Sequence, residues 1–202
     1  MDLAGRVNGG LRRVPTWPVY LLGMAPAVWF FWLGFTGGLG VEPISELEHR
    51  LGLTGLQFLI AGLAVTPLRR LTGINLIRFR RALGLIAFFY ILLHLLVWLV
   101  LDLQSVQRVA ADIVKRPYIT VGMAGFLLLV PLALTSTNRA IRRMGPVRWR
   151  RLHRLVYVAV PLGAVHFVML VKGWQLEPLL YLIGVLALLA ARIRLNRRRV
   201  VA

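Results

Sequence analysis

The sequence predicts an all-α membrane protein, a polytopic bundle of about six transmembrane helices. The first indication is composition, because 58% of the 202 residues are hydrophobic and the mean hydropathy is +0.74. A bilayer core about 30 Å thick requires about 20 mostly apolar residues per helix, so the chain has room for six spans and little else. The other two indications are the number of apolar stretches and the distribution of charge between them.

Six apolar stretches follow one another along the chain, and we expect each to form one helix. Three prolines fall within or near the ends of these stretches, at positions 67, 131 and 161, where neighbouring groups must satisfy the carbonyls that proline leaves free. The predicted spans cover residues 17–35, 51–68, 82–101, 118–136, 155–171 and 178–193.

The charged residues sort to opposite sides of a six-span membrane protein. The N-terminal segment, the second-to-third and fourth-to-fifth connections and the C-terminal tail contain 20 of the 25 Lys and Arg residues, whereas six of the seven acidic residues fall on the other side. Lys and Arg favour cytoplasmic loops, so we expect both termini in the cytoplasm. This topology explains the net charge of +18 without a nucleic acid partner, and we expect none.

The chain contains no cysteine, which excludes disulfides, thiolate metal sites, iron–sulfur clusters and covalently attached c-type haem. It contains four histidines, of which His94 and His166 lie within predicted spans. A histidine in hydrocarbon needs partners for its ring nitrogens, because an unsatisfied polar group there is costly. These two residues are therefore the first candidates for a functional site.

His94 and His166 lie at similar depths in two helices that run in the same direction. His94 precedes Asp102 by eight residues and His166 precedes Lys172 by six, so each is about 9 to 12 Å from the outer end of its helix. Two imidazoles at a common depth could bind a haem iron between them. They could also form separate interhelical hydrogen bonds, and their spacing does not decide between these interpretations.

The other two histidines carry weaker predictions. We place His49 in the acidic outer loop and His153 at the start of the fifth helix. His153 precedes His166 by 13 residues, which puts it about 20 Å away on a different helix face unless Pro161 bends the segment. A second cofactor at His153 is one interpretation, and spacing favours the other, an interfacial histidine among arginines.

Several motifs resemble those of ferric-reductase-like membrane domains. The third predicted span contains RRALGL at residues 80–85, FY at 89–90 and LHL at 93–95. The fifth contains WRRLHRLVY at 149–157 followed by HF at 166–167, with TPLRR at 66–70 and TST at 135–137 elsewhere. Within that family, these segments resemble in particular the haem-binding membrane subunits of bacterial periplasmic methionine-sulfoxide reductase systems.

The resemblance covers nearly the whole chain and implies one domain over residues 1–202 that acts as a b-type cytochrome of the bacterial inner membrane. It implies haem b with His94 and His166 as axial iron ligands, and bound flavin mononucleotide (FMN). It implies electron supply from a cytoplasmic flavin reductase or a membrane quinone. The implied acceptor is a periplasmic, molybdopterin-containing methionine-sulfoxide reductase subunit.

The third predicted helix departs from the pattern of relatives that bind two haems. Such relatives carry two histidines on this helix, whereas here the position fourteen residues before His94 is Arg80, whose guanidinium stays protonated and is no ordinary haem ligand. The number of haems, one or two, stays open, and His153 would need another partner, a different cofactor or a place beside a propionate. The arginines near His153 suit haem propionates and flavin phosphate equally, or serve only topology.

We expect an electron-transfer subunit without substrate catalysis of its own, because no catalytic triad and no dinucleotide-binding G-x-G-x-x-G motif after a strand is present. A ferric reductase or another transmembrane electron carrier is the alternative within this class. A histidine-dependent transporter and a cofactor-free membrane anchor are alternatives of other classes.

Overall fold

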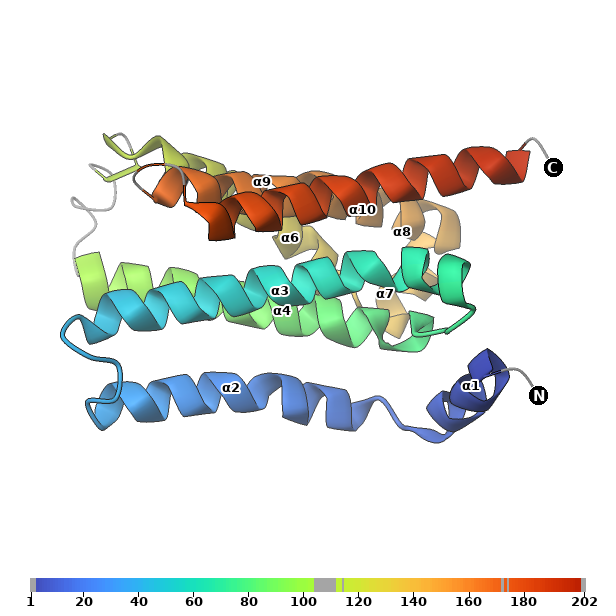
Figure 1. Ribbon diagram of the computed structural model, residues 1–202, viewed down its shortest axis with the longest axis horizontal. Helices are drawn as coiled ribbons and strands as arrows, with labels where there is room; N and C mark the ends of the chain where they lie inside the picture. The colour runs from blue at the N-terminus through green and yellow to red at the C-terminus, as the bar shows by residue number, and fades with distance from the viewer. Residues whose placement is uncertain (1–2, 104–111, 114, 172, 174, 201–202) are drawn as a thin grey trace.

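The computed structural model describes residues 3–103, 112–113, 115–171, 173 and 175–200. Within these residues, six helices are long and apolar enough to cross a membrane. They lie roughly side by side, and both ends of the chain lie at the same end of the bundle (Figure 1). The all-α, six-span prediction is confirmed. We call this end, which holds most arginines, the basic end and the opposite one the acidic end.

Twelve helical segments have bounds within the described residues. In order they are α1 (Leu3–Arg13), α2 (Trp17–Phe35), α3 (Pro43–Thr72), η1 (Ile77–Phe79), α4 (Arg80–Leu96), η2 (Val97–Leu103), α6 (Pro117–Leu134), α7 (Asn138–Met144), α8 (Pro146–Leu152), η3 (His153–Leu155), α9 (Val156–Leu170) and α10 (Leu176–Val200).

Helix α3 is much longer than the predicted span 51–68. It begins with Pro43 in its first turn, where the missing N–H of proline costs nothing, and an ion pair of 2.6 Å joins Glu46 to Arg50 one turn later. It ends at Thr72, and the next residue, Gly73, has a φ of 77° that suits only glycine well. His49 therefore lies in the first turns of α3, and its prediction as a loop residue was wrong.

The third and fifth spans are each built from segments of different helical pitch. Helix α4 continues into η2, a π-helical segment at the acidic end. Helix α8 leads through the tight turn η3 into α9, so the fifth apolar helix extends over Pro146–Leu170. The predicted start at residue 155 was too late, because the preceding arginine-rich segment is helical although it is polar.

Helix α1 was not predicted, because it is short and polar and its support is tertiary. Asn8 donates its side-chain amide to the Gly73 carbonyl at 3.0 Å and accepts from the Asn75 N–H at 2.8 Å. Arg78 donates to the carbonyls of Leu11 and Arg12 at the end of α1. These bonds fasten α1 to the α3–α4 connection at the basic end (Figure 1).

The bundle is organised around two closely packed helix pairs, α3 with α4 and α6 with α9. Helix α10 packs against α9 and α3, and α2 packs against α3 and α4. A core cluster joins five helices through one or more buried residues from each, including Leu63, Ala87, Leu129, Val160 and Val185. The two pairs are thereby held together as one unit.

Tyr90 fastens α2 to α4 by entering the hydrogen-bond ladder of α2. Its hydroxyl accepts from the Ala27 N–H at 2.9 Å and donates to the Gly23 carbonyl at 2.8 Å, and its ring is fully buried. In an unbroken helix this N–H would bond this carbonyl directly. The insertion lies beside Pro26, which already interrupts the ladder.

We expect Tyr90→Phe to destabilise the protein by about 1 to 3 kcal/mol, because both backbone groups would lose their partner where no water replaces it. Thermal unfolding in detergent measures this. Tyr20→Phe is the matched control, since Tyr20 is a half-buried tyrosine on α2 itself. Equal stability of the two variants would show that the inserted hydroxyl contributes nothing.

Candidate functional site: two facing histidines

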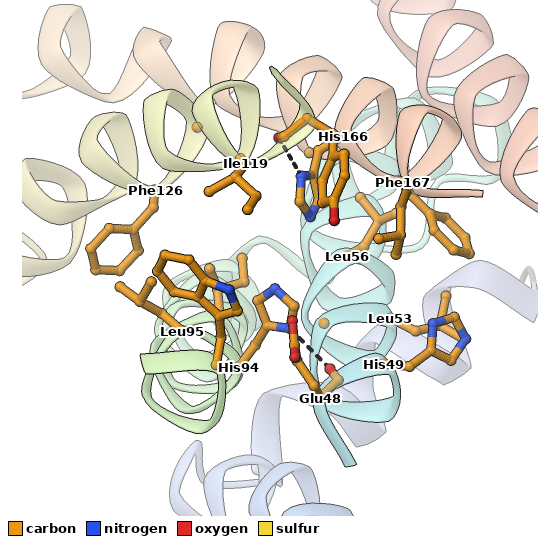
Figure 2. A pocket seen from close by; sticks show the side chains of 18 of the residues that line it. Glu48, His49, Leu53, Leu56, His94, Leu95, Ile119, Phe126, His166 and Phe167 are labelled. Atoms are coloured by element: carbon orange, nitrogen blue, oxygen red, sulfur yellow. Dashed lines mark hydrogen bonds between the residues drawn. The ribbon is translucent and has the colours of Figure 1, made fainter. Parts of the chain in front are cut away.

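His94 on α4 and His166 on α9 meet inside the bundle, between the two helix pairs. Their ring centroids are 6.2 Å apart and their planes are inclined by 80°. Each side chain comes from a different helix pair, so the two pairs face one another through these rings (Figure 2). The structure thus brings together the two histidines for which the sequence predicted a similar depth in the membrane.

Each of the two rings is tied to a backbone carbonyl of its partner helix. His94 Nδ1 lies 2.9 Å from the Glu48 carbonyl on α3, and His166 Nδ1 lies 2.7 Å from the Tyr118 carbonyl on α6. A carbonyl can only accept, so both Nδ1 atoms carry the proton and both Nε2 atoms keep a free lone pair. Figure 2 shows the second ring nitrogens directed toward each other.

Glycine allows each imidazole to lie directly against the neighbouring helix. A Cβ added at Gly52 would lie 2.9 Å from His94 Nδ1, and one at Gly122 would lie 2.7 Å from His166 Nδ1. Each glycine follows the accepting carbonyl by four residues, on the same helix face. The same arrangement therefore occurs twice, once in each helix pair.

The histidines line a cavity of about 620 Å³ between the two helix pairs, a size typical of small-molecule and cofactor sites. Its walls are mainly apolar, and polar residues lie on the same lining. The apolar part includes Leu56, Ile91, Trp98, Phe126, Leu129 and Phe167, and the polar part includes Glu48, His49, Asp102 and Arg116.

Arg116 supplies a positive charge to the rim of this cavity, just before α6 begins. It donates to the Tyr118 hydroxyl at 3.3 Å and lies 3.4 Å from Asp112. The bond to Tyr118 is the largest cause that raises the pKa of Arg116 above its usual value. Arg116 therefore stays charged at any physiological pH.

The cavity suits a planar metal complex better than a bare metal ion. Among the described residues, no group of three or more His, Cys, Asp or Glu is placed to hold a metal. A metal–imidazole bond is about 2 Å and the nitrogen lies about 1 Å from the ring centre, so a metal between two imidazoles separates their centres by about 6 Å. The observed 6.2 Å matches this, and the remaining ligands would have to come from a bound group.

His153 lies apart from this pair, in η3 at the basic end. Its Nδ1 donates to the Trp149 carbonyl at 3.1 Å, and its Nε2 lies 3.4 Å from the Ser136 hydroxyl. The Trp149 ring stacks on the imidazole with centroids 3.7 Å apart. Both nitrogens of His153 thus face protein oxygen atoms, unlike the Nε2 atoms of the central pair.

His49 lines the same cavity as the central pair and was missed because it was assigned to a loop. Its ring centroid lies 5.7 Å from that of Phe167. The signal that could have found it is the helix start at Pro43 with the Glu46–Arg50 spacing, which extends α3 over it. The carbonyls of Glu48 and Tyr118 have no comparable signal, because any residue type supplies a carbonyl.

Comparisons with known proteins find one family and several similar proteins. Residues 50–164 match the family described as "Ferric reductase like transmembrane component". A protein of Brucella anthropi named "Protein-methionine-sulfoxide reductase heme-binding subunit MsrQ" is 52% identical over 178 residues, which cover 88% of this chain and 80% of the relative. Proteins of the same name from Brucella ovis and Brucella melitensis are 53% identical with the same coverage. No solved structure matches the chain.

We expect Gly52→Ala and Gly122→Ala each to destabilise the protein by roughly 1 to 3 kcal/mol, because the added methyl group would collide with a fixed imidazole. Thermal unfolding measures the change. Gly62→Ala on α3 is the control, since its Cβ would meet nothing within 4 Å, and alanine there should be neutral or stabilise the helix by up to about 1 kcal/mol. A Gly122→Ala protein as stable as Gly62→Ala would contradict the close fit.

Proposed function

This chain belongs to the ferric-reductase-like transmembrane family, together with the MsrQ haem-binding subunits, and from this we propose that it is a b-type cytochrome that carries electrons across the bacterial inner membrane. The observation that supports the proposal most strongly is the pair of unprotonated Nε2 atoms, which face one another at the separation that a bound metal requires. A bound metal would satisfy both lone pairs, which are costly to leave without a partner in a mainly apolar cavity.

His94 and His166 would hold haem b as its two axial ligands, in the cavity between the helix pairs. Iron with both axial positions filled by imidazole passes single electrons and has no open position for oxygen or substrate. The carbonyls of Glu48 and Tyr118 fix the tautomer and the orientation of the two rings and make each Nε2 a stronger donor. The apolar walls exclude water, which raises the influence of these hydrogen bonds on the iron.

The basic end would lie in the cytoplasm, because arginines gather there and Lys and Arg favour cytoplasmic loops. We propose that a cytoplasmic flavin reductase or a membrane quinone supplies the electrons, and that bound FMN takes part near that end. The central histidines lie toward the acidic end, so a haem bound there would lie nearer the outer surface in this orientation. From there an electron could leave for a periplasmic, molybdopterin-containing methionine-sulfoxide reductase subunit, as the name of the relatives suggests.

We propose one haem at the central pair and a structural role for His153. Its ring nitrogens already face the Trp149 carbonyl and the Ser136 hydroxyl, and the stacked indole covers its plane. A second haem would require both the removal of these contacts and an opposite ligand. The chain would then work as one domain with one metal centre, without substrate catalysis of its own.

We expect His94→Ala and His166→Ala each to abolish nearly all of the low-spin haem absorbance, because one imidazole cannot saturate the iron. Purified protein from haem-replete cells is compared before and after dithionite, with the haem-to-protein ratio measured by extraction. His49→Ala and His153→Ala are the matched histidine controls and should keep both the spectrum and a ratio near one. A colourless wild-type protein would refute the cytochrome assignment, and a ratio near two would refute the single haem.

The acceptor is tested separately, with wild-type protein reduced by dithionite in detergent. We expect its haem to be reoxidised within seconds once the purified molybdopterin-containing subunit and methionine sulfoxide are both present. Dithionite is removed first, and the subunit is added in an amount well below that of the haem, because oxidised molybdenum can itself accept electrons. Methionine sulfoxide alone should leave the haem reduced, and the subunit alone should oxidise only a minor fraction of it. A haem that stays reduced with both components, yet is reoxidised by ferric citrate, would favour a ferric reductase instead.

A further inference from the structure

The side chain of Gln57 on α3 is exposed on the outside of the bundle, within the apolar part of a span. The nearest charged residues along this helix are Arg50, seven residues before it, and Arg69, twelve residues after it. At 1.5 Å per residue, Gln57 is therefore about 10 Å from the first and about 18 Å from the second along the helix axis. An exposed side chain at this depth meets lipid hydrocarbon, which neither donates nor accepts a hydrogen bond.

Gln57 uses only part of its hydrogen-bonding capacity within the chain. Its Nε2 donates to the Tyr181 hydroxyl of α10 at 2.7 Å, and among the residues that the structure describes its amide forms no other hydrogen bond. A side-chain amide also has a second N–H and a carbonyl oxygen that can accept. Leaving these groups in hydrocarbon is costly. The surface around Gln57 therefore favours a partner that can both donate and accept at this depth.

The surface beside Gln57 is open enough for another helix to approach. Helix α10 packs against α3, and the two lie side by side (Figure 1). Ala61 follows Gln57 by one turn on the same face of α3 and is exposed as well. A Cβ added at Gly62 of α3 or at Gly184 of α10 would meet nothing within 4 Å. Small residues let the backbones of two membrane helices come close together.

We call this surface the α3–α10 seam. It consists of Gln57, Ala61 and Gly62 on α3 and of Tyr181 and Gly184 on α10. The large exposed side chains of α10, in contrast, are apolar and suit lipid tails, namely Leu180, Ile183 and Leu186. The amide of Gln57 therefore distinguishes the seam from an ordinary lipid-facing surface.

A second copy of this chain fits the seam better than a different protein does. Two copies inserted in the same orientation are related by a twofold axis along the membrane normal, so that residues of equal depth meet. An amide is self-complementary, because its N–H donates to the same kind of oxygen that it carries. The second copy thus supplies the donor and the acceptor that Gln57 lacks, whereas another protein would need a polar side chain of its own at this depth.

We propose that the chain forms a twofold symmetric dimer through the α3–α10 seam, in which the Gln57 amides of the two copies bond to each other. Neither His94 nor His166 belongs to this surface. The dimer therefore does not depend on the proposed cytochrome function, and the haem spectrum does not bear on it.

Because the chain contains no cysteine, single cysteine substitutions can test the interface. Ala61→Cys places one thiol on the seam and leaves Gln57 unchanged. Val28→Cys on α2 and Leu127→Cys on α6 are the controls, because these side chains are 71% and 63% exposed on other helices. Full-length protein in native membranes is oxidised with copper phenanthroline, and the disulfide-linked product is measured by electrophoresis without reductant.

Two further substitutions in the Ala61→Cys protein separate the contact between copies from the fold of one copy. Gln57→Leu removes the amide. Tyr181→Phe removes the same hydrogen bond within the chain but keeps the amide, so it is the matched control. The mass of the protein in a mild detergent, measured by light scattering, checks both changes in protein without cysteine.

We expect Ala61→Cys to give a product of twice the chain mass, several times more abundant than any product of the two control cysteines. Gln57→Leu should weaken the association about tenfold, because hydrogen bonds between membrane helices contribute at this level, and Tyr181→Phe should retain it. A product no more abundant than in the controls, or one joined to a different protein, would overturn the dimer. A product that Gln57→Leu leaves unchanged, or that Tyr181→Phe reduces equally, would also refute the proposal.

Discussion

The structure depends above all on the absence of water from the bilayer core, which obliges each polar group there to find its partner inside the protein. Three unrelated features meet this demand in the same way. The Tyr90 hydroxyl enters the ladder of α2, Arg192 donates to the carbonyl that Pro67 leaves free, and each central histidine donates to a carbonyl of its partner helix. In each case a side chain on one helix satisfies the backbone of another, so the same bonds that solve a local problem also fasten helices together.

The central histidines illustrate how such a bond can prepare a site for chemistry. Once Nδ1 is committed to a carbonyl, the lone pair of Nε2 is the only part of the ring that remains to be used. Gly52 and Gly122 bring each ring close enough to its helix for this bond to form. The same arrangement occurs in both helix pairs. When the α3–α4 pair packs against the α6–α9 pair, the two Nε2 lone pairs therefore face each other across the cavity. In the proposed cytochrome, the protein therefore presents both axial ligands in their binding state, and little reorganisation accompanies a change of charge on the iron.

Charge divides the molecule along its length. The acidic end carries the carboxylates of the described residues. The rim of the histidine cavity also lies there, and Arg116 contributes a charged guanidinium to this rim. The basic end carries most of the arginines. Membrane topology explains exposed arginines in loops, but it does not explain Arg192, because its side chain is buried.

The sequence by itself determined the class of the fold, the six spans, the common end of the two termini and the similar depth of His94 and His166. These follow from properties that a linear pattern records, namely the length of apolar runs, the alternation of charge and the depth of a residue along a straight helix. Only the tertiary structure decided that His49 is helical, that α1 is fastened through Asn8, and that the carbonyls of Glu48 and Tyr118 orient the rings. Those facts depend on backbone atoms and on contacts between distant segments. Because every residue has the same carbonyl group, the residue type does not indicate which carbonyl will accept a hydrogen bond from a histidine.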